Sequence, residues 1–241
     1  MSQKTIEKVL VANRGEIAIR IFRACYDLGL HTVAMYSAED INSLFRIRAD
    51  EAYLTGEGKS PLGAYLDIPG IIDLAKRRGV SAIHPGYGFL SENPAFARAC
   101  EENGIIFIGP PSDVLAKMGD KLAAKAIAKE CAVPTIPGCT EPLRDADEAL
   151  EKAVSYGFPI ILKAAAGGGG RGMRRCGTPE EVKPAYELVH SEAEKSFGCG
   201  DIFIEKYLVE PKHIEVQILA DEYGNVYHLG ERDCSLQRRY Q

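Results

Sequence analysis

The feature that most constrains the fold is an alternation of short apolar runs and amphipathic stretches across the first hundred or so residues. Four runs rich in β-branched residues are typical of buried strands, at residues 9–12, 32–36, 81–83 and 105–108. Between them, residues 17–28, 68–78 and 92–102 carry apolar side chains at helical spacing. Strand–helix–strand alternation predicts an open parallel sheet with right-handed crossovers, so the fold class is α/β.

Three polar or glycine-containing loops follow these strands, at residues 13–16, 84–88 and 109–112. Ligand sites of parallel sheets collect at the carboxyl ends of the strands, so these loops are candidate site segments. Two common nucleotide signatures are absent. Residues 56–60 contain Gly-Lys-Ser, but Tyr53 stands where a P-loop needs glycine, and the single Gly15 does not make a dinucleotide fingerprint. An NAD-dependent dehydrogenase is therefore disfavoured.

The sequence pattern changes after an alanine-rich helical stretch at residues 121–129. Prolines and Gly138 mark a connection there. The expected elements that follow are a strand at 159–163, a helix at 179–195, and strands at 201–206, 213–219 and 226–229. A turn at residues 222–225 is expected to lead into the last of these strands.

A glycine-rich segment after the strand at 159–163 carries the clearest chemical signal. Four consecutive glycines at 167–170 let successive backbone N–H groups converge on an anion. Lys163, Arg171, Arg174 and Arg175 bring positive charge to the same stretch, as phosphate oxygens require. A flexible linker is the alternative, but linkers are seldom bracketed by a strand and cations. The segment predicts a flap that covers phosphates.

Composition narrows the functional classes. The net charge of −5 argues against a nucleic-acid binder. No signal-like or membrane-spanning apolar stretch is seen, so a cytoplasmic location without membrane contact is expected. The seven cysteines contain no C-x-x-C pair and fit reduced thiols better than disulfides or zinc ligands.

Five segments, in the same order over the whole chain, resemble the biotin carboxylase family of ATP-grasp enzymes. They are residues 11–20, 84–93, 118–121, 163–174 and 231–239. Within this family, residues 60–69 and 196–200 look more like the pyruvate carboxylases than the acetyl-CoA carboxylase subunits.

The resemblance implies an order of domains. Residues 1–130 would form a Rossmann-like biotin carboxylase N-terminal domain, which precedes an ATP-grasp domain. Residues 131–204 would form the ATP-grasp lid with its glycine-rich loop. Residues 205–241 would begin the C-terminal ATP-grasp subdomain, which the segment leaves incomplete.

The resemblance also implies ATP contacts. Lys121 and Lys163 would meet the phosphates, and Gly169 and Gly170 would lie in the flap. The hinge that meets the adenine would be Glu205, Lys206, Tyr207 and Leu208. Three further side chains would complete the site: His213, Gln237 and Tyr240. His213 would contact the ribose. Tyr240 departs from the family, which usually has histidine there, and its nucleotide contact is in doubt.

The first predicted helix presents Glu16, Arg20, Arg23 and Asp27 on one face. A solvated charged face is one interpretation. The resemblance gives the other, in which Arg23 and Asp27 lie at a two-fold contact and the N-terminal domain forms a homo-oligomer.

The implied reaction has two stages. Bicarbonate attacks the γ-phosphate of ATP to give carboxyphosphate, and the carboxyl group then passes to biotin on a carrier domain. This is the first half-reaction of a pyruvate carboxylase. The Mg²⁺ ligands, the bicarbonate-contacting lysine and the catalytic arginine are expected beyond the position of Gln241, so no catalytic or metal-binding residue is assigned and this segment alone should not turn over. Three alternatives stay open: an acyl-CoA carboxylase subunit, another ATP-grasp ligase such as a carboxylate–amine ligase, and a non-catalytic nucleotide-binding or dimerisation fragment.

Overall fold

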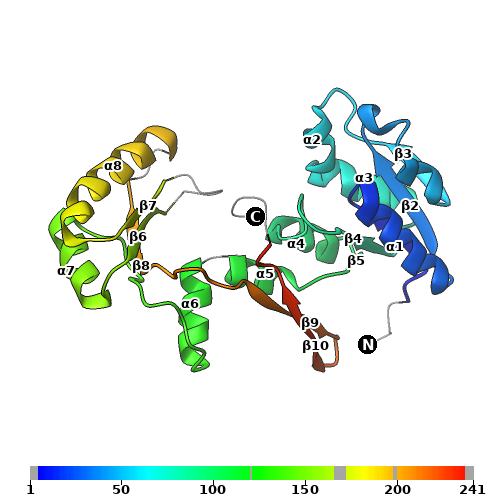
Figure 1. The fold of residues 1–241 in the computed structure, drawn as a ribbon. Coiled ribbons are helices and arrows are strands. Elements are labelled where there is room, and N and C mark those ends of the chain that lie inside the picture. The colour runs from blue at the N-terminus through cyan, green and yellow to red at the C-terminus, as the bar shows by residue number, and fades with distance from the viewer. Residues whose placement is uncertain (1–4, 120, 166–171, 198–199, 237–241) are drawn as a thin grey trace. The chain divides into compact units, whose positions relative to one another are not determined.

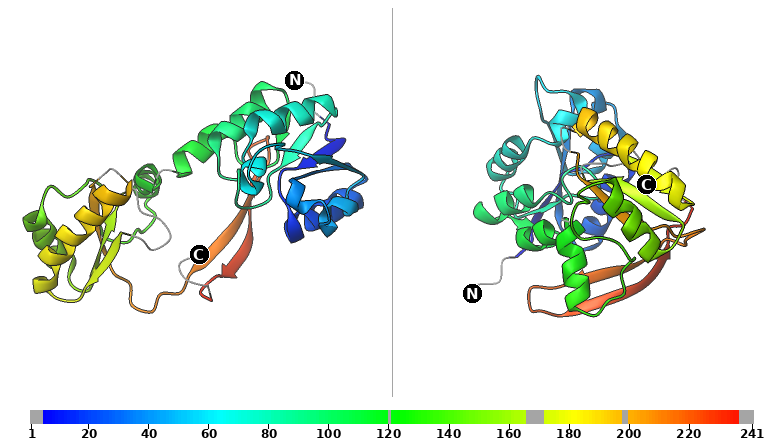
Figure 2. Two further views of the ribbon diagram at one scale, coloured as in Figure 1. Left: turned by 90° about the horizontal axis from the view of Figure 1, so that it is seen from above. Right: turned by 90° about the vertical axis from the view of Figure 1, so that its left-hand side faces the viewer.

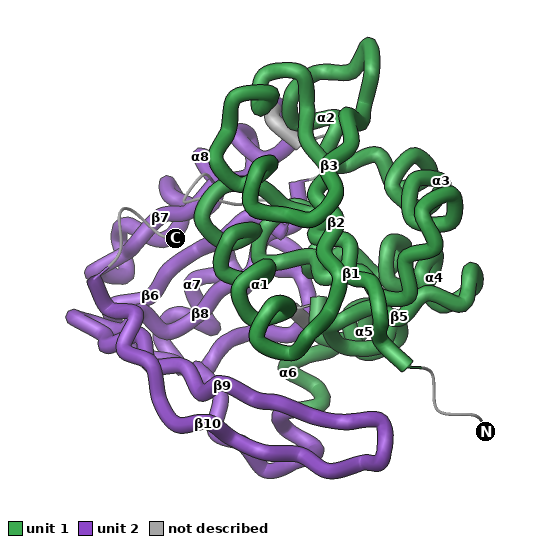
Figure 3. The backbone as a smooth tube through the Cα atoms, turned by 90° about the vertical axis from the view of Figure 1, so that its right-hand side faces the viewer, with its two compact units in different colours: residues 1–127 green, residues 128–241 purple. Residues whose placement is uncertain are grey.

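The computed structural model describes residues 5–119, 121–165, 172–197 and 200–236. The chain divides into two compact units, residues 1–127 and 128–241, which are coloured separately in Figure 3. Each unit has its own sheet and its own apolar core, and each is described by itself.

The first unit contains a five-stranded parallel sheet in the order β3-β2-β1-β4-β5 (Figure 1). The strands are β1 (Lys8–Val11), β2 (His31–Tyr36), β3 (Glu51–Leu54), β4 (Ala82–His84) and β5 (Ile106–Phe107). The helices are α1 (Gly15–Asp27), α2 (Pro61–Tyr65), α3 (Ile68–Arg77), α4 (Pro94–Glu102) and α5 (Ser112–Gly119), with 3₁₀ turns at Ala38–Asp40 and Leu44–Arg48. Helix α6 (Lys121–Glu130) spans the boundary between the two units. The predicted parallel α/β sheet is confirmed.

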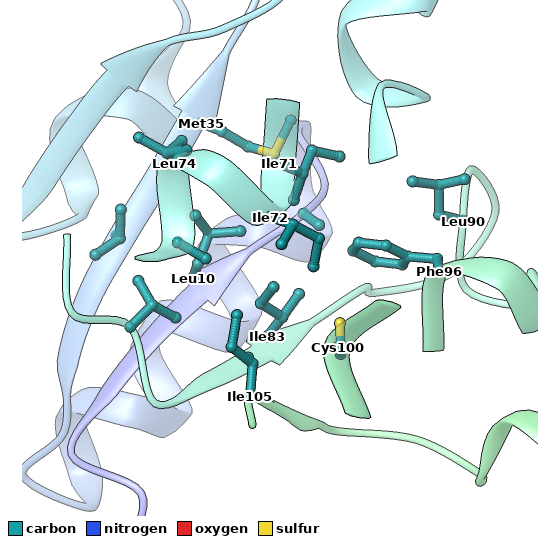
Figure 4. Close-up of a cluster of buried hydrophobic side chains, with 14 of the residues drawn as sticks. Leu10, Met35, Ile71, Ile72, Leu74, Ile83, Leu90, Phe96, Cys100 and Ile105 are labelled. Atoms are coloured by element: carbon teal, nitrogen blue, oxygen red, sulfur yellow. The ribbon is translucent and has the colours of Figure 1, made fainter. Parts of the chain in front are cut away.

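Alternate residues of β1 explain why helices cover both faces of this sheet. Leu10 packs with Ile71 of α3 and Phe96 of α4 in one cluster of buried side chains (Figure 4). Val9 and Val11 point to the opposite face, where they pack with Phe22 of α1. Strands that are apolar on both faces are typical of parallel sheets covered by helices.

Two of the loops at the carboxyl ends of the strands are joined by hydrogen bonds. Asn13, which follows β1, donates its Nδ2 to the Pro85 carbonyl at 2.7 Å and to the Tyr87 carbonyl at 2.8 Å. Gly86 has a φ of 67°, and a Cβ atom there would lie 2.7 Å from Asn13 Nδ2. The loop after β4 therefore closes over the end of β1, at the point where the strand order reverses.

The second unit contains a three-stranded antiparallel sheet, β7-β6-β8, and a two-stranded hairpin, β9-β10. Its strands are β6 (Ile160–Ala164), β7 (Met173–Cys176), β8 (Ile202–Lys206), β9 (Ile214–Ala220) and β10 (Val226–Asp233), and its helices are α7 (Ala146–Tyr156) and α8 (Pro179–Phe197). Both helices lie against the same face of the β6–β8 sheet, where Ile160, Leu162, Ile202 and Ile204 are fully buried (Figures 1 and 2).

The connection at residues 137–143 runs along the outer edge of β8. Cys139 N–H donates to the Ile204 carbonyl at 3.0 Å, Leu143 N–H donates to the Ile202 carbonyl at 2.8 Å, and Lys206 N–H donates to the Pro137 carbonyl at 2.8 Å. The connection thus satisfies backbone groups that would otherwise form an open strand edge.

Two further properties hold for the described residues. None of their helices combines the length and the apolar character that crossing a membrane requires. Their six cysteines are free thiols, in agreement with the prediction from spacing.

Candidate functional site

The face of the β6–β8 sheet opposite the helices is built by residue alternation. On β6, Ile160, Leu162 and Ala164 are buried under α7 and α8, so Ile161 and Lys163 point to the other side. The pairing registers place two neighbours from each adjacent strand on that side. We call this set the open face; it consists of Ile161, Lys163, Met173, Arg175, Phe203 and Glu205.

An ion pair lies at the centre of the open face. Lys163 Nζ contacts Glu205 Oε2, and the two side chains are 37% and 16% exposed. Lys163 is opposite Phe203, and Glu205 is opposite Ile161, so the pair is a diagonal one across β6 and β8. The ammonium group has three donors, so it can bind an anion while it keeps its contact with Glu205.

Lys206 has a different role from Lys163. Its Nζ donates to the carbonyls of Gly157 and Phe158, both at 2.9 Å, at the connection between α7 and β6. Its charge therefore stabilises the entry to β6 and is directed away from the open face.

The hinge after β8 contains a backbone donor with no acceptor among the described residues. Tyr207 N–H donates to the Pro159 carbonyl at 3.0 Å, and the Tyr207 ring lies under the Arg175 guanidinium, 5.0 Å from the ring centroid. The next backbone donor, Leu208 N–H, has no acceptor within the described part of the chain. A planar base beside the hinge could accept a hydrogen bond from it.

The structure brings Lys163 together with the hinge residues 205–208. Lys121 is the first residue of α6, and its side chain lies outside the described atoms. His213 directly precedes β9, where its N–H donates to Ser235 Oγ at 3.0 Å and its carbonyl accepts from Cys234 N–H at 2.7 Å. Gly169, Gly170, Gln237 and Tyr240 lie outside the described residues.

Two of the arginines beside the glycine-rich segment lie on different sides of the sheet. Arg174 and Arg175 lie on β7, a strand that the sequence pattern did not predict. Arg174 pairs with Glu192 of α8 at 2.8 Å, and Arg175 stacks on Tyr207. Arg174 therefore lies on the helix side of the sheet, whereas Arg175 lies on the open face together with Lys163.

Sequence reasoning missed Gly138, which it read only as a mark of the connection. In the structure Gly138 forms a β-bridge with Glu205. A Cβ atom at Gly138 would lie 2.8 Å from Glu205 Cγ. A glycine that follows a proline in a connecting segment gives no sign in the sequence that it touches a residue 67 positions later.

A second surface of interest lies on the first unit. A groove of about 580 Å³ runs beside α1 and is lined by Ile19, Phe22, Arg23, Tyr26, Asp27, Leu44 and Arg48. Tyr26 is 84% exposed and Leu44 is 54% exposed, so apolar area faces solvent there. Within the described part of the chain, neither Arg23 nor Asp27 forms an ion pair.

The described residues contain no cluster of three His, Cys, Asp or Glu side chains that could hold a metal ion. On the open face, Lys163 offers positive charge and Ile161 and Phe203 offer half-buried apolar area, which suits an anionic, partly apolar ligand.

Two family models match the chain in consecutive segments. Residues 5–115 match the biotin carboxylase N-terminal domain. Residues 120–241 match the ATP binding domain of the carbamoyl-phosphate synthase L chain.

Similar proteins agree with these matches. The chain is 58% identical over its full length to pyruvate carboxylase of Bacillus subtilis and 56% identical to mitochondrial pyruvate carboxylase of Rattus norvegicus. It covers only 21% and 20% of those proteins. A biotin carboxylase domain dimer of 2-oxoglutarate carboxylase from Hydrogenobacter thermophilus, solved with MgADP, ADP and bicarbonate, is 54% identical with a TM-score of 0.86. That alignment covers 99% of this chain and 52% of the solved one.

The parallel sheet of the first unit, the open face of the second and the two consecutive family matches lead to one assignment: the chain belongs to the biotin carboxylase family and comprises its N-terminal domain and the beginning of its ATP-binding domain.

Proposed function

We propose that this chain is the ATP-binding part of an enzyme that carboxylates biotin with bicarbonate through carboxyphosphate, as the first half-reaction of a pyruvate carboxylase. The observation that carries the proposal is the Lys163–Glu205 ion pair on the open face. The hinge that follows Glu205 adds the Leu208 N–H, which has no acceptor among the described residues. The high identity to pyruvate carboxylases supports the choice of reaction.

The open face suits a nucleotide in parts. Phe203 and Ile161 offer half-buried apolar area for a base, and Leu208 N–H offers a donor to a ring nitrogen. Lys163 offers positive charge for phosphate oxygens. A cation in that place also stabilises the charge that shifts during phosphoryl transfer.

Lys121, Gly169, Gly170, His213, Gln237 and Tyr240 stay predicted ATP contacts. Mg²⁺ would neutralise phosphate charge when bound, and the Hydrogenobacter relative was solved with MgADP. Because the described residues hold no metal cluster, we propose that its carboxylate ligands come from outside them.

The proposed partners are bicarbonate, a biotinylated carrier domain and a second copy of this chain. The groove beside Arg23 and Asp27 is the proposed contact with the second copy, because it exposes apolar side chains between charged ones. A cytoplasmic location is proposed, as are domain boundaries near residues 130 and 204.

A second acceptor is compatible with the comparisons. The Hydrogenobacter relative is a 2-oxoglutarate carboxylase, and its biotin carboxylase domain is as similar to this chain as several pyruvate carboxylases are. The first half-reaction is the same for both acceptors, so the proposal for this chain does not depend on which one the native protein uses.

The test is ATP cleavage by the native protein with and without bicarbonate. We expect phosphate release that requires bicarbonate and rises when free biotin is added. If phosphate release does not depend on bicarbonate and instead requires an amine and another carboxylate, the protein is a different ATP-grasp ligase.

A further inference from the structure

The edge of β8 that faces residues 137–143 has an unusually close backbone contact. Gly138 forms a β-bridge with Glu205. A Cβ atom built on Gly138 would lie 2.8 Å from Glu205 Cγ and 2.8 Å from the Ile204 carbonyl oxygen. Both distances are shorter than ordinary van der Waals contact, so no side chain fits at position 138 unless Glu205 or the strand moves.

Glu205 is held from two sides. Gly138 approaches its Cγ from the outer edge of the sheet, while Lys163 on β6 contacts its carboxylate from the inner side. The side chain is only 16% exposed, so it has little room to take another conformation. The position of the Glu205 carboxylate therefore depends on the missing side chain at Gly138.

Lys163 depends in turn on Glu205. A free lysine side chain samples many rotamers, and ordering it costs conformational entropy. The contact with Glu205 holds the ammonium on the open face before any ligand arrives. A preordered cation binds an anion more tightly, because less entropy is lost on binding.

We propose that Gly138 is a positioning residue of the nucleotide site. Its missing side chain lets Glu205 occupy the position from which the carboxylate holds the Lys163 ammonium. The placement of Glu205 and Lys163 stands on the geometry alone, and its consequence for ATP rests on the proposed function.

The placement is tested first without nucleotide, by hydrogen exchange of the β6 and β8 backbone amides in the native protein. Lys163→Met and Glu205→Gln are made singly and together. In the protein that keeps Gly138, the loss of exchange protection in the double variant should differ by about three-fold from the product of the losses in the two single variants. This is the coupling expected of a partly exposed ion pair. With Gly138→Ala the coupling should vanish. Coupling that is absent with Gly138, or unchanged by Gly138→Ala, overturns the proposal.

Gly138→Ala could also act through the Ile204 carbonyl, and a second cycle separates that effect. Glu205→Ala removes the Cγ atom that the new methyl group meets. We expect Glu205→Ala to restore part of the stability that Gly138→Ala loses, even if the single variant does not fold. Strictly additive losses, or a double variant that is also unfolded, contradict the proposal. Gly177→Ala is the matched control, because its nearest neighbour would be the Glu181 carboxylate at 3.7 Å.

Nucleotide binding is measured on the same proteins. We expect Gly138→Ala to weaken ADP binding about five-fold and adenosine binding less than two-fold, because Lys163 is expected to act on phosphates. Equal weakening of both ligands would place the effect at the base and contradict the role through Lys163. If the unmodified protein binds no ADP, the proposed function fails. The hydrogen-exchange measurements on the Lys163 and Glu205 variants still show whether Gly138 positions Glu205.

Discussion

Lys206 Nζ donates a 2.9 Å hydrogen bond to the carbonyl of Phe158, and a second one of the same length to Gly157. Its neighbour Glu205 points to the opposite face of β8 and contacts Lys163. Two adjacent residues of one strand thus have different roles on its two faces. Lys206 secures the entry to β6 from the helix side, and Glu205 arranges the charge on the open face.

Replacement of Lys206 should affect stability. Lys206→Met removes the ammonium group that donates hydrogen bonds to two partly buried carbonyl groups. We expect the free energy of unfolding to fall by about 2 kcal/mol, measured by urea denaturation. The control is Lys183→Met, whose ammonium pairs with Asp147 at an exposed site and should matter by less than about 0.5 kcal/mol. Equal losses for the two variants would contradict the structural role of Lys206.

Replacement of Lys163 should affect nucleotide affinity. Lys163→Met removes the cation of the open face, and we expect the Kd for ADP to rise at least about ten-fold, from the loss of one charge-assisted hydrogen bond. Isothermal titration calorimetry gives the Kd directly. Lys152→Met is the control, because Lys152 pairs with Glu148 within α7. An unchanged Kd in Lys163→Met would remove the open face as the phosphate site.

Reversal of the Arg23 charge should prevent self-association. Arg23→Glu places a second carboxylate beside Asp27 in the groove, and like charges at a contact oppose it. Sedimentation equilibrium should show a dimer for the unmodified protein and a dimer at least ten times weaker for the variant. Arg98→Glu makes the same charge change on α4 and should leave the dimer intact. If the unmodified protein stays monomeric at micromolar concentration, the proposed contact between two copies through the groove is contradicted.

Stability should fall at acid pH through Glu51 on β3. Hydrogen bonds from Lys8, and then from Tyr53, lower the pKa of Glu51 from 4.5 to about 2. A depressed pKa means that this stabilisation is complete above pH 4.5 and is lost as the pH falls towards 2. After allowance for solvent screening, we expect a loss of about 1 kcal/mol across this window.

Glu51→Gln isolates that contribution. The variant should be less stable than the unmodified protein at pH 6 and nearly equal to it at pH 2, because protonated Glu51 resembles glutamine. A difference in unfolding free energy that stays constant from pH 6 to pH 2 would exclude Glu51 as the source.

The long periodic elements could be predicted from the sequence because burial repeats along them. The pattern from Ile17 to Leu28 gives α1, and the β-branched runs give β1 and β2, within one or two residues of their bounds. Two short strands escaped this reasoning. β3 begins with Glu51, whose partners, Lys8 on β1 and His31 on β2, come together only in the folded sheet. β7 contains Arg174 and Arg175, whose partners come from α8 and from the hinge.

The same limit applies to the site. The phosphate role of Lys163 is predicted from its place beside the glycine run and from the family resemblance, because a lysine alone is more often a solvated surface residue. The contact of Glu205 with Lys163, and the approach of Gly138 to Glu205, arise from strand register and from a connection that returns along β8. Such pairings depend on tertiary structure, and no local pattern encodes them.

Transfer of radiolabel from bicarbonate to biotin tests the proposed half-reaction most directly. The native protein is incubated with ATP, Mg²⁺, labelled bicarbonate and free biotin, and the acid-labile carboxyl group on biotin is counted. We predict labelled carboxybiotin that requires ATP and falls at least about ten-fold in Lys163→Met. Protein that binds ADP and cleaves ATP but leaves biotin unlabelled would contradict biotin carboxylation.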